Sequence, residues 1–210
     1  MNAREEVLGR IRTALGENRT AVPDVARDYR LTDGRDPGDP ALLDLFVDRL
    51  EDYRASVLRC GPGEVAATVT RALDSGLGTG WSPGAVVVAP GLPEHWRPEG
   101  VAPDDGRPAV ELAGSAASVT GVATAVAETG TLVLDGSSLS GRRALSLLPD
   151  CLVCVVEAAQ VVGSVPEGLA VLDPVAPLTM ISGPSATSDI ELQRVEGVHG
   201  PRTLVVVLVA

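Results

Sequence analysis

Aromatic side chains are scarce in this sequence: they make up 2% of its 210 residues. The hydrophobic core must therefore be aliphatic, and the chain lacks the stacking surface that proteins binding single-stranded nucleic acid usually present. Positive charge is also scarce, because 28 Asp and Glu residues oppose 17 Lys and Arg residues and the formal net charge is -11. Such a charge repels phosphate backbones, so a nucleic-acid partner is not expected.

Cysteine is limited to three residues, Cys60, Cys151 and Cys154. An odd number argues against a disulfide framework, and three thiols cannot supply a four-cysteine iron–sulfur site. Cys151 and Cys154 have the spacing of a metal or redox pair, but the apolar run 151–156 predicts a buried strand. Residues i and i+3 of a strand face opposite sides, so we interpret these thiols as buried and inert, and we predict no metal site.

Long apolar runs are absent as well. No stretch approaches the ~20 residues of a membrane helix, and residues 1–15 lack the apolar core of a signal peptide. The sequence contains neither a P-loop nor a Rossmann fingerprint. We therefore expect a cytoplasmic protein with no membrane span.

What remains predicts an N-terminal extension followed by one α/β domain. Asn2 with Glu5 resembles a capping box and precedes an apolar stripe, so residues 2–15 are predicted to be a helix. Residues 17–39 show little periodicity and predict an extended or disordered linker. We expect the helix and linker to occupy residues 1–38 and the domain to occupy residues 39–210.

Within the domain, apolar segments alternate between helical and strand periods. A β-α-β order favours a parallel sheet with helices on its faces. The almost wholly apolar run 203–209 predicts a strand in the sheet interior. Shorter apolar runs at 109–112 and 178–181 are predicted as a short strand and a buried strand, respectively.

Two connections in the second half of the chain carry reactive side chains. Glu128 lies between predicted strands at 122–127 and 131–134, where Gly130 suits a hairpin turn. It is either an exposed reactive carboxylate at a strand end or a solvated turn residue. Arg142 opens a predicted helix after a loop of Gly and Ser, where it either binds a carboxylate or phosphate or lies on the surface of a capped helix.

The stretch Leu178–Arg202 carries the remaining candidates. Gly183 and Ser185 lie in a small-residue turn after a predicted strand, and Thr187, Ser188 or Asp189 can cap a short helix that follows. Gly-rich turns and helix starts present N–H groups to small anions, so a small anionic or polar ligand is predicted at one end of the sheet. The alternative is that these segments are only tight turns.

Three motifs together resemble the LUD domain. They are AETGT at residues 127–131, Gly141-Arg142 followed by LSLLP at 145–149, and SGPS at 182–185 continued by DIE at 189–191 and GVHGP at 197–201. More narrowly, the chain resembles the lactate-utilisation protein C family (LutC-like, also called YkgG) over roughly residues 39–210. The resemblance implies an α/β fold of the NagB/RpiA/CoA-transferase group, with a parallel-rich sheet flanked by helices.

The resemblance also implies a part in the cytoplasmic oxidation of L-lactate to pyruvate. In that system the iron–sulfur clusters belong to partner proteins, so no cofactor is expected in this chain. The expected role is a non-redox subunit of an iron–sulfur, NAD-independent L-lactate dehydrogenase complex, binding a small organic anion, the iron–sulfur partner subunits, or both. Two alternatives stay open: an enzyme of the isomerase/CoA-transferase-like fold that acts on an acyl or sugar-acid substrate through Glu128, and a small-anion sensor.

The predicted site is one pocket at the ends of the sheet strands. Glu128 and His199 would exchange or orient a proton on a 2-hydroxy or 2-oxo acid, since His titrates near neutral pH. Arg142 and the N–H groups around Ser185 would hold the carboxylate. The predicted ligand-binding set is completed by Gly183, Thr187, Asp189 and Glu191. The alternative is that Asp189 and Glu191 only cap and solvate a helix while His199 satisfies a turn.

Overall fold

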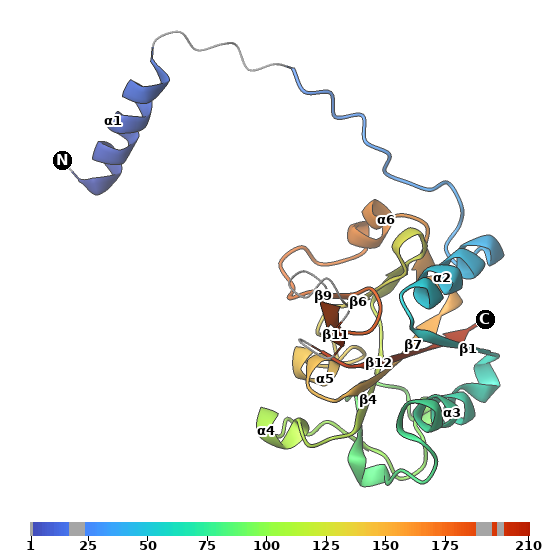
Figure 1. The fold of residues 1–210 in the computed structure, drawn as a ribbon. Coiled ribbons are helices and arrows are strands. Elements are labelled where there is room, and N and C mark those ends of the chain that lie inside the picture. Colours follow the sequence, from blue (N-terminus) through green and yellow to red (C-terminus); the bar gives the residue numbers. More distant parts are fainter. Residues whose placement is uncertain (1, 17–23, 188–194, 197–199) are drawn as a thin grey trace.

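The computed structural model describes residues 2–16, 24–187, 195–196 and 200–210 (Figure 1). Helix α1 (Ala3–Leu15) begins with the predicted capping box, in which the side chains of Asn2 and Glu5 each accept from the other's backbone N–H. None of its residues is buried. Residues 24–39 contain neither helix nor strand, as predicted for this part of the linker.

A six-stranded sheet forms the centre of the molecule, and every neighbouring pair in it is parallel. The α/β prediction is therefore confirmed. β12 lies between β1 and β7, so the predicted interior position of the last strand is also confirmed. The order across the sheet is β1 (Ser56–Cys60), β12 (Thr203–Val209), β7 (Cys151–Glu157), β4 (Ala117–Gly121), β2 (Val86–Val88) and β3 (Ala102–Pro103).

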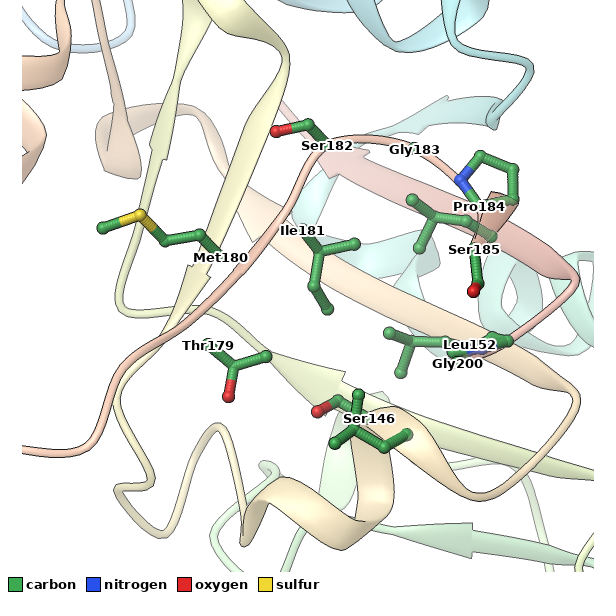
Figure 2. Close-up of a pocket in the computed structure, with 13 residues that line it drawn as sticks. Ser146, Leu152, Thr179, Met180, Ile181, Ser182, Gly183, Pro184, Ser185 and Gly200 are labelled. Carbon is green, nitrogen blue, oxygen red and sulfur yellow. The ribbon is translucent and has the colours of Figure 1, made fainter. Parts of the chain in front are cut away.

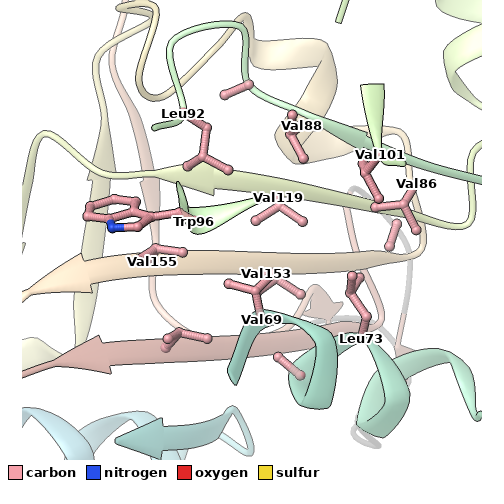
Figure 3. Packing of buried hydrophobic residues seen from close by; sticks show 14 of the residues in the cluster. Val69, Leu73, Val86, Val88, Leu92, Trp96, Val101, Val119, Val153 and Val155 are labelled. Carbon is pink, nitrogen blue, oxygen red and sulfur yellow. The ribbon is translucent and has the colours of Figure 1, made fainter. Parts of the chain in front are cut away.

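One face of this sheet is covered by α3 (Val65–Leu77), whose Val69 and Leu73 lie against Val153 (Figure 3). The opposite face is covered by α2 (Pro40–Asp52) and by a second sheet. Figure 1 shows α2 and α3 on opposite sides of the central strands. The alternation along β7 places Cys151 in the first cluster and Cys154 in the second, so the two thiols are buried on opposite faces, as predicted.

The second sheet has four short strands, and β5 and β6 form its central hairpin. The hairpin turns through the 3-10 helix η4 (Ala127–Thr129) and Gly130, whose φ of 60° is left-handed, as the turn prediction required. The sheet packs Ala125 and Leu132 against the central sheet. Its order is β8 (Val161–Val162), β5 (Thr124–Val126), β6 (Thr131–Leu134) and β9 (Thr179–Ile181).

β9 corrects one sequence-based expectation. The run 178–181 was expected to be a buried strand, but β9 is an edge strand of the second sheet and its Met180 is 52% exposed. A three-residue strand can be apolar without being enclosed, because it borders cavities and solvent on its unpaired side.

A second correction concerns residues 109–112, where a strand was expected. They form the helix α4 (Ala109–Leu112), with Leu112 buried and Val110 exposed. Four apolar residues do not distinguish a strand from a helix by periodicity, and the preceding Pro108 is compatible with a helix start. The sixth strand of the central sheet is instead the two-residue β3.

The remaining elements are short. Helix α5 (Arg143–Leu147) precedes β7, and helix α6 (Val165–Ala170) follows β8. β10 (Ala186–Thr187) pairs antiparallel with β11 (Val195–Glu196), and the helix predicted after Asp189 lies outside the described residues. In the described part of the chain, no helix combines the length and apolarity needed to cross a membrane. The extent of the domain, 39–210, stays a prediction.

Candidate functional site

Two neighbouring cavities lie beside β9 and α5, and one of them also borders the central sheet. The first, which we call the β9 cavity, has a volume of about 180 Å³. Its floor includes Leu152 and Leu204, the second residues of β7 and β12. The site therefore lies at the amino-terminal ends of these parallel strands, whereas open α/β sheets usually bind ligands at the carboxyl ends. The lining comprises Ser146, Leu147, Leu152, residues 179–185, Gly200, Pro201 and Leu204.

The second cavity, which we call the α5 cavity, has a volume of about 210 Å³. Ser146 and Thr179 line both cavities, so the two spaces are adjacent. Each cavity alone falls below the ~300–1,000 Å³ typical of pockets for drug-sized ligands. The lining of the α5 cavity comprises Leu134, Gly136, Gly141, Arg142, Arg143, Ser146, Pro177 and Thr179.

The alternation of β9 determines which side chains face the β9 cavity. Figure 2 shows Ile181 pointing toward Leu152, while Met180 and Ser182 point away from it. The Ser182 hydroxyl instead lies 2.8 Å from the Thr131 hydroxyl of the neighbouring β6. β9 is thereby tied into its sheet by a polar contact on one face and borders the cavity with the other.

The turn after β9 is fixed by close packing. Gly183 has φ of 93°, and a Cβ built there would lie 2.7 Å from Cβ of Tyr53, so only glycine fits without strain. Ser185 donates its N–H to the Pro201 carbonyl at 2.8 Å. That N–H is therefore engaged within the fold, although both Gly183 and Ser185 line the β9 cavity.

Arg142 lines the α5 cavity but directs its guanidinium to the loop after β3. Its Nε and Nη2 donate to the two carboxylate oxygens of Asp104 at 2.6 and 2.9 Å, and Nη2 also donates to the Arg107 carbonyl at 2.7 Å. The Asp104 side chain is only 4% exposed. These hydrogen bonds lower the pKa of Asp104 and raise the pKa of Arg142.

Arg143, which the sequence analysis did not single out, has different partners. Its Nε donates to the Thr179 hydroxyl at 3.1 Å and its Nη2 donates to the Leu178 carbonyl at 2.8 Å. Among the described residues, its guanidinium has no carboxylate partner. The sequence holds no signal that separates the two adjacent arginines, because the choice depends on Asp104, 38 residues away along the chain.

Glu128 lines neither cavity. Its Oε2 accepts from Arg30 Nη2 at 2.5 Å and its Oε1 accepts from the Val165 N–H at 2.9 Å. Its own N–H donates to the Gly163 carbonyl at 3.1 Å. Glu128 thus joins the N-terminal segment to the first turn of α6, on the side of the second sheet away from the β9 cavity.

The other predicted site residues are only partly described. Thr187 lies in β10, where its backbone pairs with Val195. His199, Asp189 and Glu191 lie outside the described residues, so their convergence on one pocket stays a prediction. Among the described residues, no cluster of three or more His, Cys, Asp or Glu side chains is placed to hold a metal ion.

Chemically, the joined cavities combine three properties. The β9 cavity has an apolar wall that includes Leu152, Ile181 and Leu204. Two residues with hydroxyl groups, Ser146 and Thr179, line both cavities, and Arg143, which has no carboxylate partner among the described residues, lines the α5 cavity. This combination suits a small molecule with one anionic end and one short apolar end.

Comparisons with known proteins agree with this architecture. The family model of the LUD domain matches residues 94–209. A protein named lactate utilization protein C from Deinococcus radiodurans is 43% identical over 175 residues, which cover 80% of this chain and 79% of that protein. A protein of the same name from Bacillus licheniformis is 36% identical over 84 residues, covering 36% of this chain and 35% of its own.

A solved structure matches over most of the fold. The crystal structure of a DUF162 family protein from Deinococcus radiodurans has a TM-score of 0.66 and 35% sequence identity. The match covers 81% of this chain and 97% of the other.

Proposed function

This chain belongs to the LUD domain family, and from that premise we propose that it is a non-redox component of a cytoplasmic L-lactate utilisation system. In this proposal the system oxidises lactate to pyruvate, and the chain binds a small organic anion and the iron–sulfur subunits that carry the electrons. The observation that carries the proposal is the 43% identity to a lactate utilization protein C across four fifths of both proteins.

The positions of the thiols support the non-redox part. Cys60, Cys151 and Cys154 are all buried, and Cys151 and Cys154 lie on opposite faces of the central sheet. Burial raises the pKa of Cys151 to about 11 and that of Cys154 to about 12. Iron–sulfur clusters need several thiolates converging on one point, and this arrangement does not fit one. Under this proposal the clusters belong to the partner subunits.

The joined β9 and α5 cavities support the anion-binding part. They are small, they contain a guanidinium that no carboxylate neutralises among the described residues, and they lie beside the motif that follows β9. A carboxylate in contact with a guanidinium gains charge-assisted hydrogen bonds. The segment 188–199 carries Asp189, Glu191 and His199, which we retain as proposed members of the same site.

Growth and co-purification together test the proposal. A strain that lacks its own protein of this family is grown on L-lactate as sole carbon source, with and without this chain together with its native iron–sulfur partners. We expect growth only when the chain is present, and we expect the affinity-tagged chain to retain an iron–sulfur protein with its characteristic visible absorption. Growth without the chain, or purification without any iron–sulfur protein, would contradict the proposal.

The alternative of a stand-alone enzyme acting through Glu128 makes a different prediction. Both carboxylate oxygens of Glu128 accept hydrogen bonds, from Arg30 and from the Val165 N–H. Glu128→Gln keeps the shape and at least one of these contacts, so under our proposal the variant still supports growth on lactate. If the variant accumulates normally and growth is lost, the alternative is favoured instead.

A further inference from the structure

The boundary between the two cavities brings together three side chains with complementary hydrogen-bonding roles. Arg143 donates to the Thr179 hydroxyl at 3.1 Å, and the Ser146 hydroxyl donates to the Arg143 carbonyl at 3.0 Å. Figure 2 shows the oxygens of Thr179 and Ser146 facing the same space. Ser146 and Thr179 are also the residues that line both cavities.

The local charge limits what this space can bind. Of the two arginines that line the α5 cavity, Arg142 is paired with Asp104, so within the described part of the chain Arg143 is the lining arginine without a carboxylate partner. One positive charge without a carboxylate partner balances one negative charge, so it suits a monoanion better than a dianion such as a phosphate ester.

The hydroxyl groups limit the ligand further. Because the Thr179 oxygen accepts from Arg143, its own proton is available for an acceptor in the cavity. Because the Ser146 hydroxyl already donates its proton within α5, its oxygen is available to accept from a ligand. A carboxylate next to a hydroxyl group matches this order of donor and acceptor.

We propose that Arg143 and Thr179 bind the carboxylate of a short-chain 2-hydroxy monocarboxylate and that Ser146 accepts from its hydroxyl group. The rest of the ligand lies in the β9 cavity against Ile181, Leu152 and Leu204, where about 180 Å³ admits only a short apolar chain. This inference rests on the proposed small-anion function and names the residues and the ligand class. A preference for a monocarboxylate distinguishes this site from the phosphate-binding sites expected of sugar-phosphate enzymes.

Binding to the purified full-length chain tests the inference. Isothermal titration calorimetry with sodium L-lactate is expected to show one site, and Arg143→Gln is expected to weaken binding about tenfold to a hundredfold, since a hydrogen bond to a charged group is lost. Arg59→Gln is the matched control, because it removes an equal charge from the exposed pair that Arg59 of β1 forms with Asp44 of α2. The control is expected to bind like the wild type.

Arg143 also ties α5 to β9, so a second variant separates recognition from structure. Thr179→Val keeps the shape and the strand propensity and removes the hydroxyl group that meets the ligand. We expect several-fold weaker lactate binding with a thermal unfolding midpoint close to that of the wild type. Wild-type affinity in both Arg143→Gln and Thr179→Val would overturn the inference.

Alternative ligands test the charge and hydroxyl arguments. Propionate, which lacks the hydroxyl group, is expected to bind more weakly than L-lactate, and inorganic phosphate and succinate are expected to bind more weakly still. Tighter binding of phosphate or succinate would overturn the charge argument, and equal binding of propionate would overturn the role of Ser146.

If the variants bind lactate normally while growth and co-purification succeed, this inference fails and the proposed function stands. If the wild-type chain binds no lactate, both this inference and the small-anion part of the proposed function fail.

Discussion

The two sheets of this molecule are stabilised by different kinds of contact. In the central sheet, β7 and β12 pair along seven residues each, and their apolar side chains are buried on both faces. In the second sheet the strands have two to four residues, and the edge strand β9 is attached by hydroxyl and guanidinium contacts as well as by backbone pairing. The two long central strands are held by apolar burial, whereas the edge strand β9, which borders the cavities, also depends on polar contacts.

This difference has a physical reason. Burial of aliphatic side chains stabilises the central sheet without regard to direction, whereas polar contacts need defined geometry and contribute about 1 kcal/mol each. β5, β6 and β8 are buried, whereas the edge strand β9 is partly exposed, and a segment with few buried apolar contacts opens locally at lower free energy than the core. Both cavities therefore border the strand that is expected to open more easily, and the β9 cavity is also lined by Leu152 and Leu204 of the central sheet.

The largest expected effect comes from a cavity in the central sheet. Leu208 is fully buried in β12, so Leu208→Ala is expected to lower the free energy of unfolding by about 2–5 kcal/mol. The matched change in the second sheet, Ile181→Ala, should cost less, about 1 kcal/mol, because Ile181 is only partly buried beside an existing cavity. Urea unfolding followed by circular dichroism measures both values. Equal losses would break the comparison.

The next effect concerns the ion pair between Arg142 and Asp104. Arg142→Gln leaves the nearly buried Asp104 without its partner and is expected to cost about 1–3 kcal/mol, less than for a fully buried pair because Arg142 is partly exposed. The exposed pair in Arg59→Gln should cost at most about 0.5 kcal/mol.

The pH dependence of this cost follows from the pKa of Asp104. The folded-state pKa is lowered, so the stabilisation is fully present above the unfolded value of about 3.9 and is lost as the pH falls through the folded value. The difference between wild type and Arg142→Gln should therefore be constant near neutral pH and shrink below about pH 4. Unfolding curves at several pH values measure it, and a difference that grows in acid would contradict the assignment.

The sequence predicted the central sheet well because its signals are local. The apolar runs 151–156 and 203–209 and the left-handed Gly130 need no knowledge of distant residues. The site depended on distant partners. Arg142 pairs with Asp104 and Glu128 pairs with Arg30, 98 residues away, so their roles could not be read from their own motifs. Very short runs such as 109–112 were undetermined because four residues carry no clear period.

A smaller effect is expected from the hydroxyl contacts of the second sheet. Thr131→Val removes the contacts of the Thr131 hydroxyl with those of Thr129 and Ser182 and is expected to cost about 1 kcal/mol. The loss should be local. Hydrogen–deuterium exchange should become faster for amides of β9 and remain unchanged for amides of β12. Equal acceleration in both strands would show that the sheets open together.

The smallest expected effect is the reaction of iodoacetamide with Cys151 and Cys154, the two thiols of β7. This reaction should be negligible in the native protein. Burial raises the pKa of Cys151 to about 11 and that of Cys154 to about 12, so thiolate is a minute fraction near neutral pH. Space is also lacking, because a Cβ placed on Gly76 would lie 2.5 Å from Sγ of Cys151. Reaction at Cys151 and Cys154 therefore requires the central sheet to open, and peptide mass spectrometry reports it for each cysteine.

Leu208→Ala destabilises that sheet and should accelerate the labelling, since the open population rises about tenfold for each 1.4 kcal/mol lost. Thr131→Val loosens only the second sheet and should leave the labelling rate unchanged. The contrary result is that Thr131→Val accelerates the labelling by the full factor that its loss of stability predicts for global unfolding. In that case the two sheets would open as one cooperative unit, and the proposed difference between them would be wrong.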